Sequence, residues 1–159
     1  MSLAYSLGKL LIEKNLKIST VESCTGGLLS SKLTDVSGSS SYITLNFVTY
    51  SNEAKHKILG VDETVLNTVG AVSEECARQM AEGLFKLTNS DICVSTTGIA
   101  GPTGGTKDKP VGLMYSAIHT SQGTKIYKIN LSPDLPREQM KNDFAEEVLK
   151  NILELIKNM

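Results

Sequence analysis

Thr20-Val21-Glu22-Ser23-Cys24-Thr25-Gly26-Gly27 is the stretch of sequence that decides how this chain folds. The apolar and β-branched residues over 16–21 predict a strand, the paired glycines predict a tight turn, and the amphipathic pattern over 28–36 predicts a helix. Open α/β sheets bind their ligands at such turns, where the carboxyl ends of the strands meet helix starts. We therefore expect the Ser23 hydroxyl to lie beside backbone N–H groups that suit an anion or a developing oxyanion.

The competing interpretation of this stretch is purely structural. In that case Ser23 and Thr25 cap the helix and the two glycines only turn the chain, because short glycine-containing motifs recur by chance. The stretch alone does not decide between the two interpretations, so the rest of the chain has to be considered.

The remaining segments show either the hydrophobic periodicity of a helix or that of a strand. Helices are expected at 4–15, 53–59, 74–87 and from about 136 to 158, and further strands at 42–50, 91–97, 111–120 and 125–131. The last two strands form a hairpin around 121–123, and Asp134 is a plausible cap for the last helix. This order predicts a three-layer α/β/α sandwich with a mixed, mainly parallel sheet of about five strands.

Composition narrows the class of protein. The 159 residues, of which 40% are hydrophobic, fit one domain over residues 1–159. With 16 basic and 17 acidic residues the net charge is −1, which disfavours nucleic-acid and membrane-surface partners. No signal-like leader or membrane-spanning apolar run is visible, so we expect a cytoplasmic protein.

Cysteine and histidine usage argues against disulfide and metal sites. The three cysteines, Cys24, Cys76 and Cys93, are an odd number without paired spacing, which fits a reducing compartment. The two histidines, His56 and His119, have no second ligand at metal-binding spacing. We therefore expect neither a metal nor a cofactor.

Three strand ends each carry a polar or glycine-rich cluster, at 22–27, 50–55 and 96–102, and the third continues into a long glycine-rich loop of the kind that usually serves a ligand. At this point the sequence resembles the CinA C-terminal domain family. The segments that carry the resemblance are 22–28, 48–55, 59–61, 70–74, 97–102, 104–105 and 109–112. They occur in order over most of the chain, so chance is a poor explanation.

The resemblance implies an activity and an active site. Stand-alone members of the family are amidases that convert nicotinamide mononucleotide to nicotinate mononucleotide and ammonia without a metal, and a homodimer or larger assembly is expected. Carried onto this chain, the resemblance makes Ser23 the nucleophile, Lys55 the general base and the Tyr50 hydroxyl its partner. A lysine can act as a base only when it is neutral, a state that burial favours.

The same resemblance implies a set of residues that contact the substrate. Peptide N–H groups of the turn and of the long loop would stabilise the oxyanion or hold the phosphate, and Arg137 would clamp phosphate. The expected substrate-binding residues are Thr25, Gly26, Gly27, Thr97, Gly98, Gly101 and Arg137.

Two departures from the family pattern leave alternatives open. Leu45-Asn46 stands where many members carry glycine, and Leu135-Pro136-Arg137 replaces Gly-Asp-Arg, with Lys141 in place of a second arginine. These departures favour a catalytically silent nucleotide-binding or interaction module related to competence-associated CinA proteins. Another alternative makes Cys24 the nucleophile at a helix N-terminus. Finally, Lys55 could be an ordinary exposed lysine and Arg137 an ordinary surface arginine.

Overall fold

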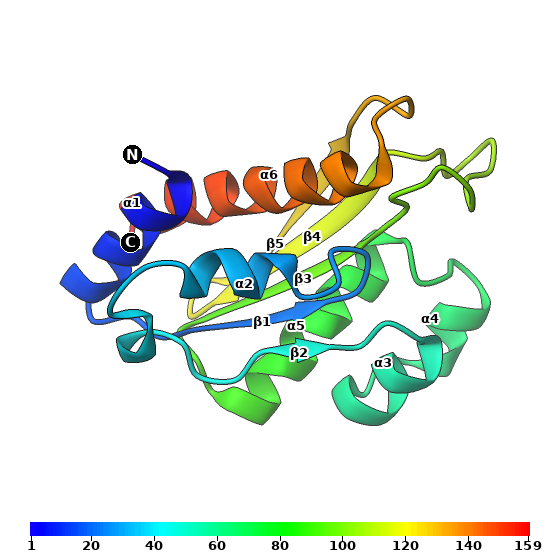
Figure 1. Cartoon of the computed structure of the whole chain (residues 1–159). Coiled ribbons are helices and arrows are strands. Elements are labelled where there is room, and N and C mark those ends of the chain that lie inside the picture. The colour runs from blue at the N-terminus through cyan, green and yellow to red at the C-terminus, as the bar shows by residue number, and fades with distance from the viewer.

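A five-stranded sheet between two layers of helices forms the body of the protein (Figure 1). The structure is a computed structural model that describes all residues from Met1 to Met159. The helices are α1 (Leu3–Glu13), α2 (Leu28–Thr34), α3 (Asn52–Leu59), α4 (Glu63–Asn67), α5 (Glu74–Thr88) and α6 (Arg137–Lys157). The strands are β1 (Ile18–Glu22), β2 (Phe47–Val48), β3 (Ile92–Gly98), β4 (Leu113–Thr120) and β5 (Gly123–Asn130).

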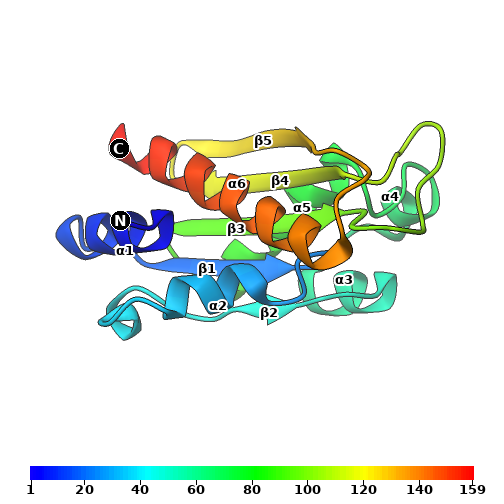
Figure 2. The same ribbon diagram turned by 45° about the horizontal axis from the view of Figure 1, so that its top comes forward.

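The strands lie in the order β2-β1-β3-β4-β5, which Figure 2 shows from the side of α6. β1 pairs in parallel with both β2 and β3, whereas β4 is antiparallel to both of its neighbours. Four strands therefore point the same way and only β4 is reversed, which confirms the predicted mixed, mainly parallel sheet. The β4–β5 hairpin also forms as expected, with Thr120 opposite Gly123.

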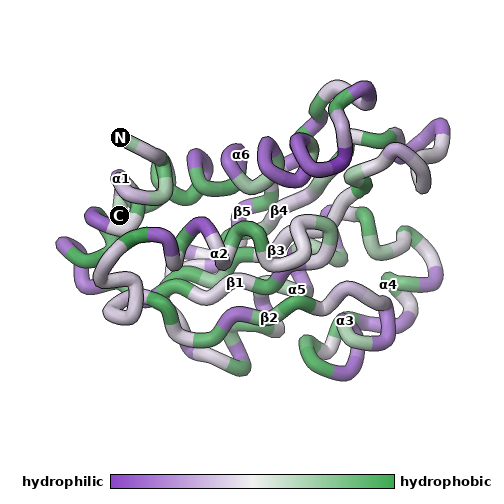
Figure 3. Tube along the Cα trace, in the orientation of Figure 1, coloured by the Kyte–Doolittle hydropathy of each residue, from purple (hydrophilic) through white to green (hydrophobic).

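Helices cover both faces of the sheet, so the predicted three-layer arrangement is confirmed. On one face, α1, α2 and α6 bury the larger apolar core, which includes Leu7, Leu33 and Phe144. On the other face, α5 packs across the strands, and α3 and α4 pack against α5. Hydrophilic and hydrophobic residues alternate along α6, as expected of a helix with one face on the sheet (Figure 3).

The second strand is much shorter than the sequence predicts. Of the predicted strand over 42–50, only β2 forms a regular ladder with β1. Side chains replace the ladder just before it: Ser19 Oγ accepts the N–H of Leu45 at 3.2 Å, and Asn46 Oδ1 accepts the N–H of Thr20 at 3.0 Å. Local β propensity does not reveal such long-range bonds, and the predicted strand was therefore too long.

Three smaller predictions also need correction. The helix α4 was missed, and the loop over 37–41 contains a 3₁₀ turn at Ser39–Ser41. Asp134 does not cap α6, since Pro136 occupies the N-cap position and the Asp134 N–H donates to Ser132 Oγ. None of the helices combines the length and the apolar character needed to cross a membrane.

Candidate active site

Ser23 and Lys55 meet at the carboxyl end of the sheet, although they lie 32 residues apart. Ser23 is the first residue after β1, and its N–H donates to the Thr96 carbonyl of β3 at 3.1 Å. Lys55 comes from α3, which begins at the N-cap Ser51, whose hydroxyl accepts the N–H of Ala54 at 3.1 Å. The cap fixes the start of α3, and so directs the lysine toward the end of β1.

Lys55 is a buried lysine whose amine is surrounded by oxygen atoms. The residue is only 1% exposed, and its Nζ lies 2.9 Å from each of three oxygens: Ser23 Oγ and the carbonyls of Thr49 and Tyr50. Burial lowers the pKa of Lys55 below its ordinary value of 10.5, which favours the neutral form. Nζ donates to all three oxygens, and an amine that kept only the two bonds to the carbonyls would direct its lone pair at Ser23 Oγ.

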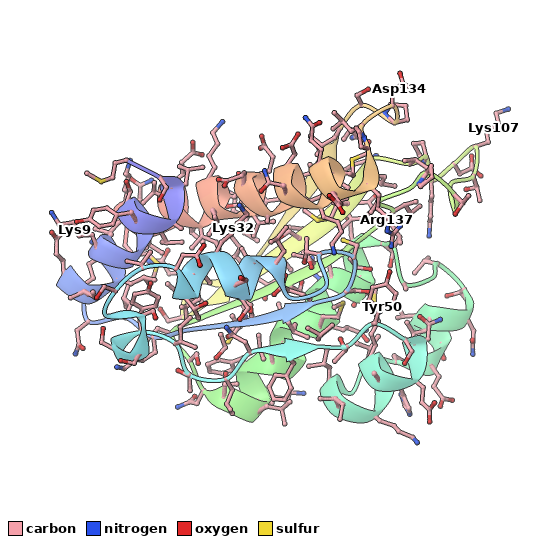
Figure 4. All side chains as sticks on the ribbon, viewed as in Figure 1. Lys9, Lys32, Tyr50, Lys107, Asp134 and Arg137 are labelled. Atoms are coloured by element: carbon pink, nitrogen blue, oxygen red, sulfur yellow. The ribbon has the colours of Figure 1, made fainter.

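The Tyr50 side chain does not reach Lys55 in this structure. Its carbonyl oxygen contacts the lysine, while the side chain is 59% exposed and its hydroxyl accepts from Arg137 Nη2 at 3.2 Å. Figure 4 shows both side chains at the same end of the molecule. Arg137 Nη1 donates to the Gly101 carbonyl at 2.6 Å. The first residue of α6 thus ties together the segments that follow β2 and β3.

A cleft of about 210 Å³ lies between these segments. It is lined by Cys24, Tyr50, Gly98, Ile99, Ala100, Gly101, Thr103, Gly104 and Arg137. The peptide N–H groups of Cys24, Ala100 and Gly101, which line the cleft, donate to no protein acceptor, and neither do those of Thr25 and Gly27 in the adjoining turn. The positive φ angles of Gly26 (61°) and Gly27 (103°) allow the turn that leaves these groups free.

Two of the predicted substrate-binding side chains are turned into the protein. Thr25 is fully buried and its hydroxyl donates to Glu22 Oε1 at 2.6 Å. Thr97 is 1% exposed and its hydroxyl donates to the Ala71 carbonyl at 2.8 Å. Gly98 and Gly101, in contrast, line the cleft. Neither Thr25 nor Thr97 lines the cleft in this structure.

Cys24 is a poor candidate for a nucleophile. Its side chain is only 5% exposed, and burial, together with the neighbouring Glu22 carboxylate, raises the pKa of Cys24 to about 12. The thiol therefore stays protonated at neutral pH, and the thiolate is the nucleophilic form. The position of Cys24 near a helix N-terminus, which motivated this alternative, does not offset the effect of burial on its pKa.

Two residues next to Ser23 were not predicted as site residues from the sequence. Glu22 and Thr96 are both fully buried, and both contribute to a hydrogen-bonded cluster with Thr25. For Glu22 the sequence does contain a signal, because a carboxylate is unusual at the end of a strand whose other residues are suited to burial on both faces of the sheet.

A larger groove, of about 400 Å³, lies between α3 and α4 and contains none of the predicted site residues. His56 lies in it, with Nε2 3.2 Å from Glu63 Oε1 and Nδ1 2.8 Å from the Val61 carbonyl. No three His, Cys, Asp or Glu side chains are grouped so as to hold a metal ion.

A family model and several known proteins are similar to this chain. The family model of the CinA C-terminal domain matches residues 1–156. The chain is 48% identical over 158 residues to a CinA-like protein of Chloroherpeton thalassium, covering 98% of this chain and 38% of that protein. It is 50% identical over 131 residues to a CinA-like protein of Endomicrobium trichonymphae, covering 82% and 31%. The chain thus spans about a third of the length of the curated relatives it matches.

A solved structure matches the whole fold. The competence/damage inducible protein CihA from Agrobacterium tumefaciens superposes with a TM-score of 0.90 at 36% sequence identity, covering 98% of this chain and 96% of that chain. The name of that protein refers to competence and damage, and states no chemical reaction.

Proposed function

The chain belongs to the CinA C-terminal domain family, and from that premise we propose that it is an amidase that hydrolyses nicotinamide mononucleotide to nicotinate mononucleotide and ammonia. The observation that carries the proposal is the contact of 2.9 Å between Lys55 Nζ and Ser23 Oγ, made by a buried lysine. A serine becomes an effective nucleophile when an adjacent base takes its proton, and the burial of Lys55 and its contact with Ser23 Oγ support this lysine as that base.

The reaction then runs in two stages. Ser23 Oγ attacks the carboxamide carbon while its proton passes to Lys55 Nζ, and the oxyanion that forms accepts hydrogen bonds from free N–H groups of the Cys24–Gly27 turn. The C–N bond breaks as Lys55 returns the proton to the departing ammonia. Water, activated by the same amine, hydrolyses the resulting acyl-enzyme and releases the acid.

The other end of the substrate is a phosphate. We assign it to Arg137 and to the free N–H groups of Ala100 and Gly101, which lie across the cleft from the Ser23 turn. The oxyanion site is assigned to the turn because its donors must lie within about 3 Å of the reacting atom, next to Ser23.

Ammonia release from nicotinamide mononucleotide by the purified protein tests the proposal. We expect turnover by the wild type, a loss of at least about a thousandfold in kcat for Ser23→Ala, and retained activity for Cys24→Ala. Activity that survives the serine change but not the cysteine change would reject the assignment.

The dependence of kcat/KM on pH tests the role of Lys55. Because only the neutral amine is a base, activity should rise with pH through the lowered pKa of Lys55 and level off before 10.5. A profile with no ionisation in that range would count against Lys55 as the base.

A catalytically silent nucleotide-binding module remains the second candidate. The observation in its favour is that the Arg137 guanidinium is already engaged by the Gly101 carbonyl and the Tyr50 hydroxyl. Binding of nicotinamide mononucleotide in calorimetry, without ammonia release, would support this candidate over the amidase.

A further inference from the structure

Glu22 is a carboxylate with full burial and no cation beside it. It is the last residue of β1 and directly precedes Ser23, yet its exposed fraction is zero and none of the ion pairs involves it. Burying a carboxylate is costly unless its oxygens accept hydrogen bonds. The environment of Glu22 must therefore supply the compensation.

Three hydrogen bonds do so. Oε1 accepts from the Thr25 hydroxyl at 2.6 Å and from the Leu29 N–H at 2.8 Å, and Oε2 accepts from the Ser30 N–H at 3.0 Å. Leu29 and Ser30 are the second and third residues of α2, whose N-cap Gly27 has no side chain to bind them. Glu22 thus serves as the missing cap, and it bridges the two ends of the Ser23–Gly27 turn.

The carboxylate also sets the direction of a longer chain of bonds. The Thr25 hydroxyl has a single proton, which it donates to Glu22 Oε1. The bond of 2.8 Å between the Thr25 and Thr96 hydroxyls must then be donated by Thr96. Thr96 Oγ1 in turn accepts from the Ser23 N–H at 3.3 Å. The chain runs from Glu22 through Thr25 and Thr96 to the backbone of the nucleophile.

We propose that Glu22 is a positioning residue, which holds the Ser23 turn through Thr25, Thr96 and the start of α2 so that Ser23 Oγ stays on Lys55 Nζ. The inference rests on the proposed amidase function. Glu22 does not act as a base itself, because Ser23 Oγ is not among its partners and both of its oxygens are already bonded. Glu22 already accepts hydrogen bonds from the N–H groups of Leu29 and Ser30, so these groups are not available to the substrate phosphate. The phosphate then binds on the opposite side of the cleft.

The first test is Glu22→Gln, which keeps the shape but replaces one acceptor oxygen by a donor that cannot bind the Ser30 N–H. We expect kcat to fall by about 10–100-fold, because a small displacement of the nucleophile costs that much, while KM stays within about twofold. The pH at which activity rises should not move, since Lys55 remains the base. The matched control is Glu154→Gln, an exposed position on α6, which should behave as the wild type.

A pair of variants at Thr25 separates positioning from packing. Thr25→Ser keeps the hydroxyl and loses a methyl group, whereas Thr25→Val keeps the shape and loses the hydroxyl. Positioning predicts that Ser retains at least about tenfold more activity than Val; a packing role predicts the reverse order. This pair also keeps the proposal testable if Glu22→Gln does not fold. The reverse order, or a Glu22→Gln enzyme within twofold of the wild-type kcat, would overturn the proposal.

A readout independent of ammonia release distinguishes failure of this inference from failure of the amidase proposal. The rate at which phenylmethylsulfonyl fluoride labels Ser23, followed by mass spectrometry, reports the reactivity of the hydroxyl alone; the Oγ–S bond forms, fluoride leaves and Lys55 takes the proton. If the wild type releases no ammonia, the amidase proposal fails. Positioning is still supported if folded Glu22→Gln is labelled at least about tenfold more slowly than the wild type, or Thr25→Val at least about tenfold more slowly than Thr25→Ser. Equal labelling rates overturn positioning, and a wild type that neither releases ammonia nor is labelled at Ser23 overturns both proposals.

Discussion

At the scale of single residues, Arg137 decides how the open side of the cleft is organised. One guanidinium nitrogen donates to the Gly101 carbonyl and another to the Tyr50 hydroxyl, so the side chain spans two loops before any substrate binds. A planar guanidinium can exchange such neutral acceptors for the two oxygens of a phosphate without changing its position.

Replacing Arg137 by Ala should therefore weaken substrate binding more than it slows the chemical step. We expect KM to rise by about 10–100-fold, the equivalent of about 1.5–3 kcal/mol for hydrogen bonds to a charged group, with a smaller fall in kcat. Steady-state measurement of ammonia release checks this, with Arg78→Ala, a surface arginine of α5 paired with Glu75, as the control. An unchanged KM for Arg137→Ala would mean that the phosphate is held elsewhere.

At the scale of elements, the close packing of α5 against α3 determines where Lys55 sits. Gly83 lies in α5 at the point where the C-terminal end of α3 approaches, and a Cβ atom at this position would overlap with the Leu59 carbonyl oxygen. Only glycine allows this approach. Since Lys55 lies one turn before Leu59 in α3, the contact links this packing site to the position of the lysine.

The effect of Gly83→Ala on stability should be opposite in sign to the usual effect of this substitution in a helix. In a helix interior, Gly→Ala normally stabilises by up to about 1 kcal/mol, but here overlap with a backbone atom should instead destabilise by about 1–3 kcal/mol. Displacement of α3 should also reduce kcat, because it separates Lys55 from Ser23. Urea denaturation measures the first effect and ammonia release the second. Lys86→Ala, at an exposed position of the same helix, should change stability by no more than about 0.5 kcal/mol. A higher urea midpoint for Gly83→Ala would contradict the packing argument.

At the scale of the whole molecule, the buried lysine makes the stability of the fold depend on pH. The pKa of Lys55 is lowered by burial in the folded protein, whereas the unfolded chain keeps the ordinary value of 10.5. Between these two values the unfolded state binds more protons than the folded state, so stability rises with pH. Below the lowered pKa, both states are protonated and the full cost of burying the charge is present.

Comparison with Lys55→Met, which removes the charge but keeps most of the volume, isolates this effect. As the pH rises from 7 toward 10.5, the wild type should gain stability relative to the variant, by at most about 1.4 kcal/mol per pH unit within the window. Urea midpoints measured at several pH values check the trend, with Lys57→Met, an exposed lysine of the same helix, as the control. A difference between wild type and Lys55→Met that does not change with pH would show that the lysine is not desolvated.

The local pattern of the sequence was enough to predict most of the architecture. Periodicity and turn residues placed the strand, turn and helix around Gly26 and Gly27, the hairpin near Gly123 and the helix α5, because these features depend on neighbours along the chain. The order of the strand ends, together with the family resemblance, was also enough to bring Ser23 and Lys55 into one predicted site, since the carboxyl ends of parallel strands meet at one edge of a sheet.

Other features were decided only by the tertiary structure. Hydrogen bonds to the side chains of Ser19 and Asn46 shorten the second strand, the Tyr50 carbonyl rather than its hydroxyl meets Lys55, and the Glu22 carboxylate is fully buried next to Ser23. Each depends on partners brought from distant parts of the chain, or on the direction in which a side chain turns once the layers have packed. Periodicity indicates which face of an element is buried, but only the assembled fold determines which polar atoms meet there.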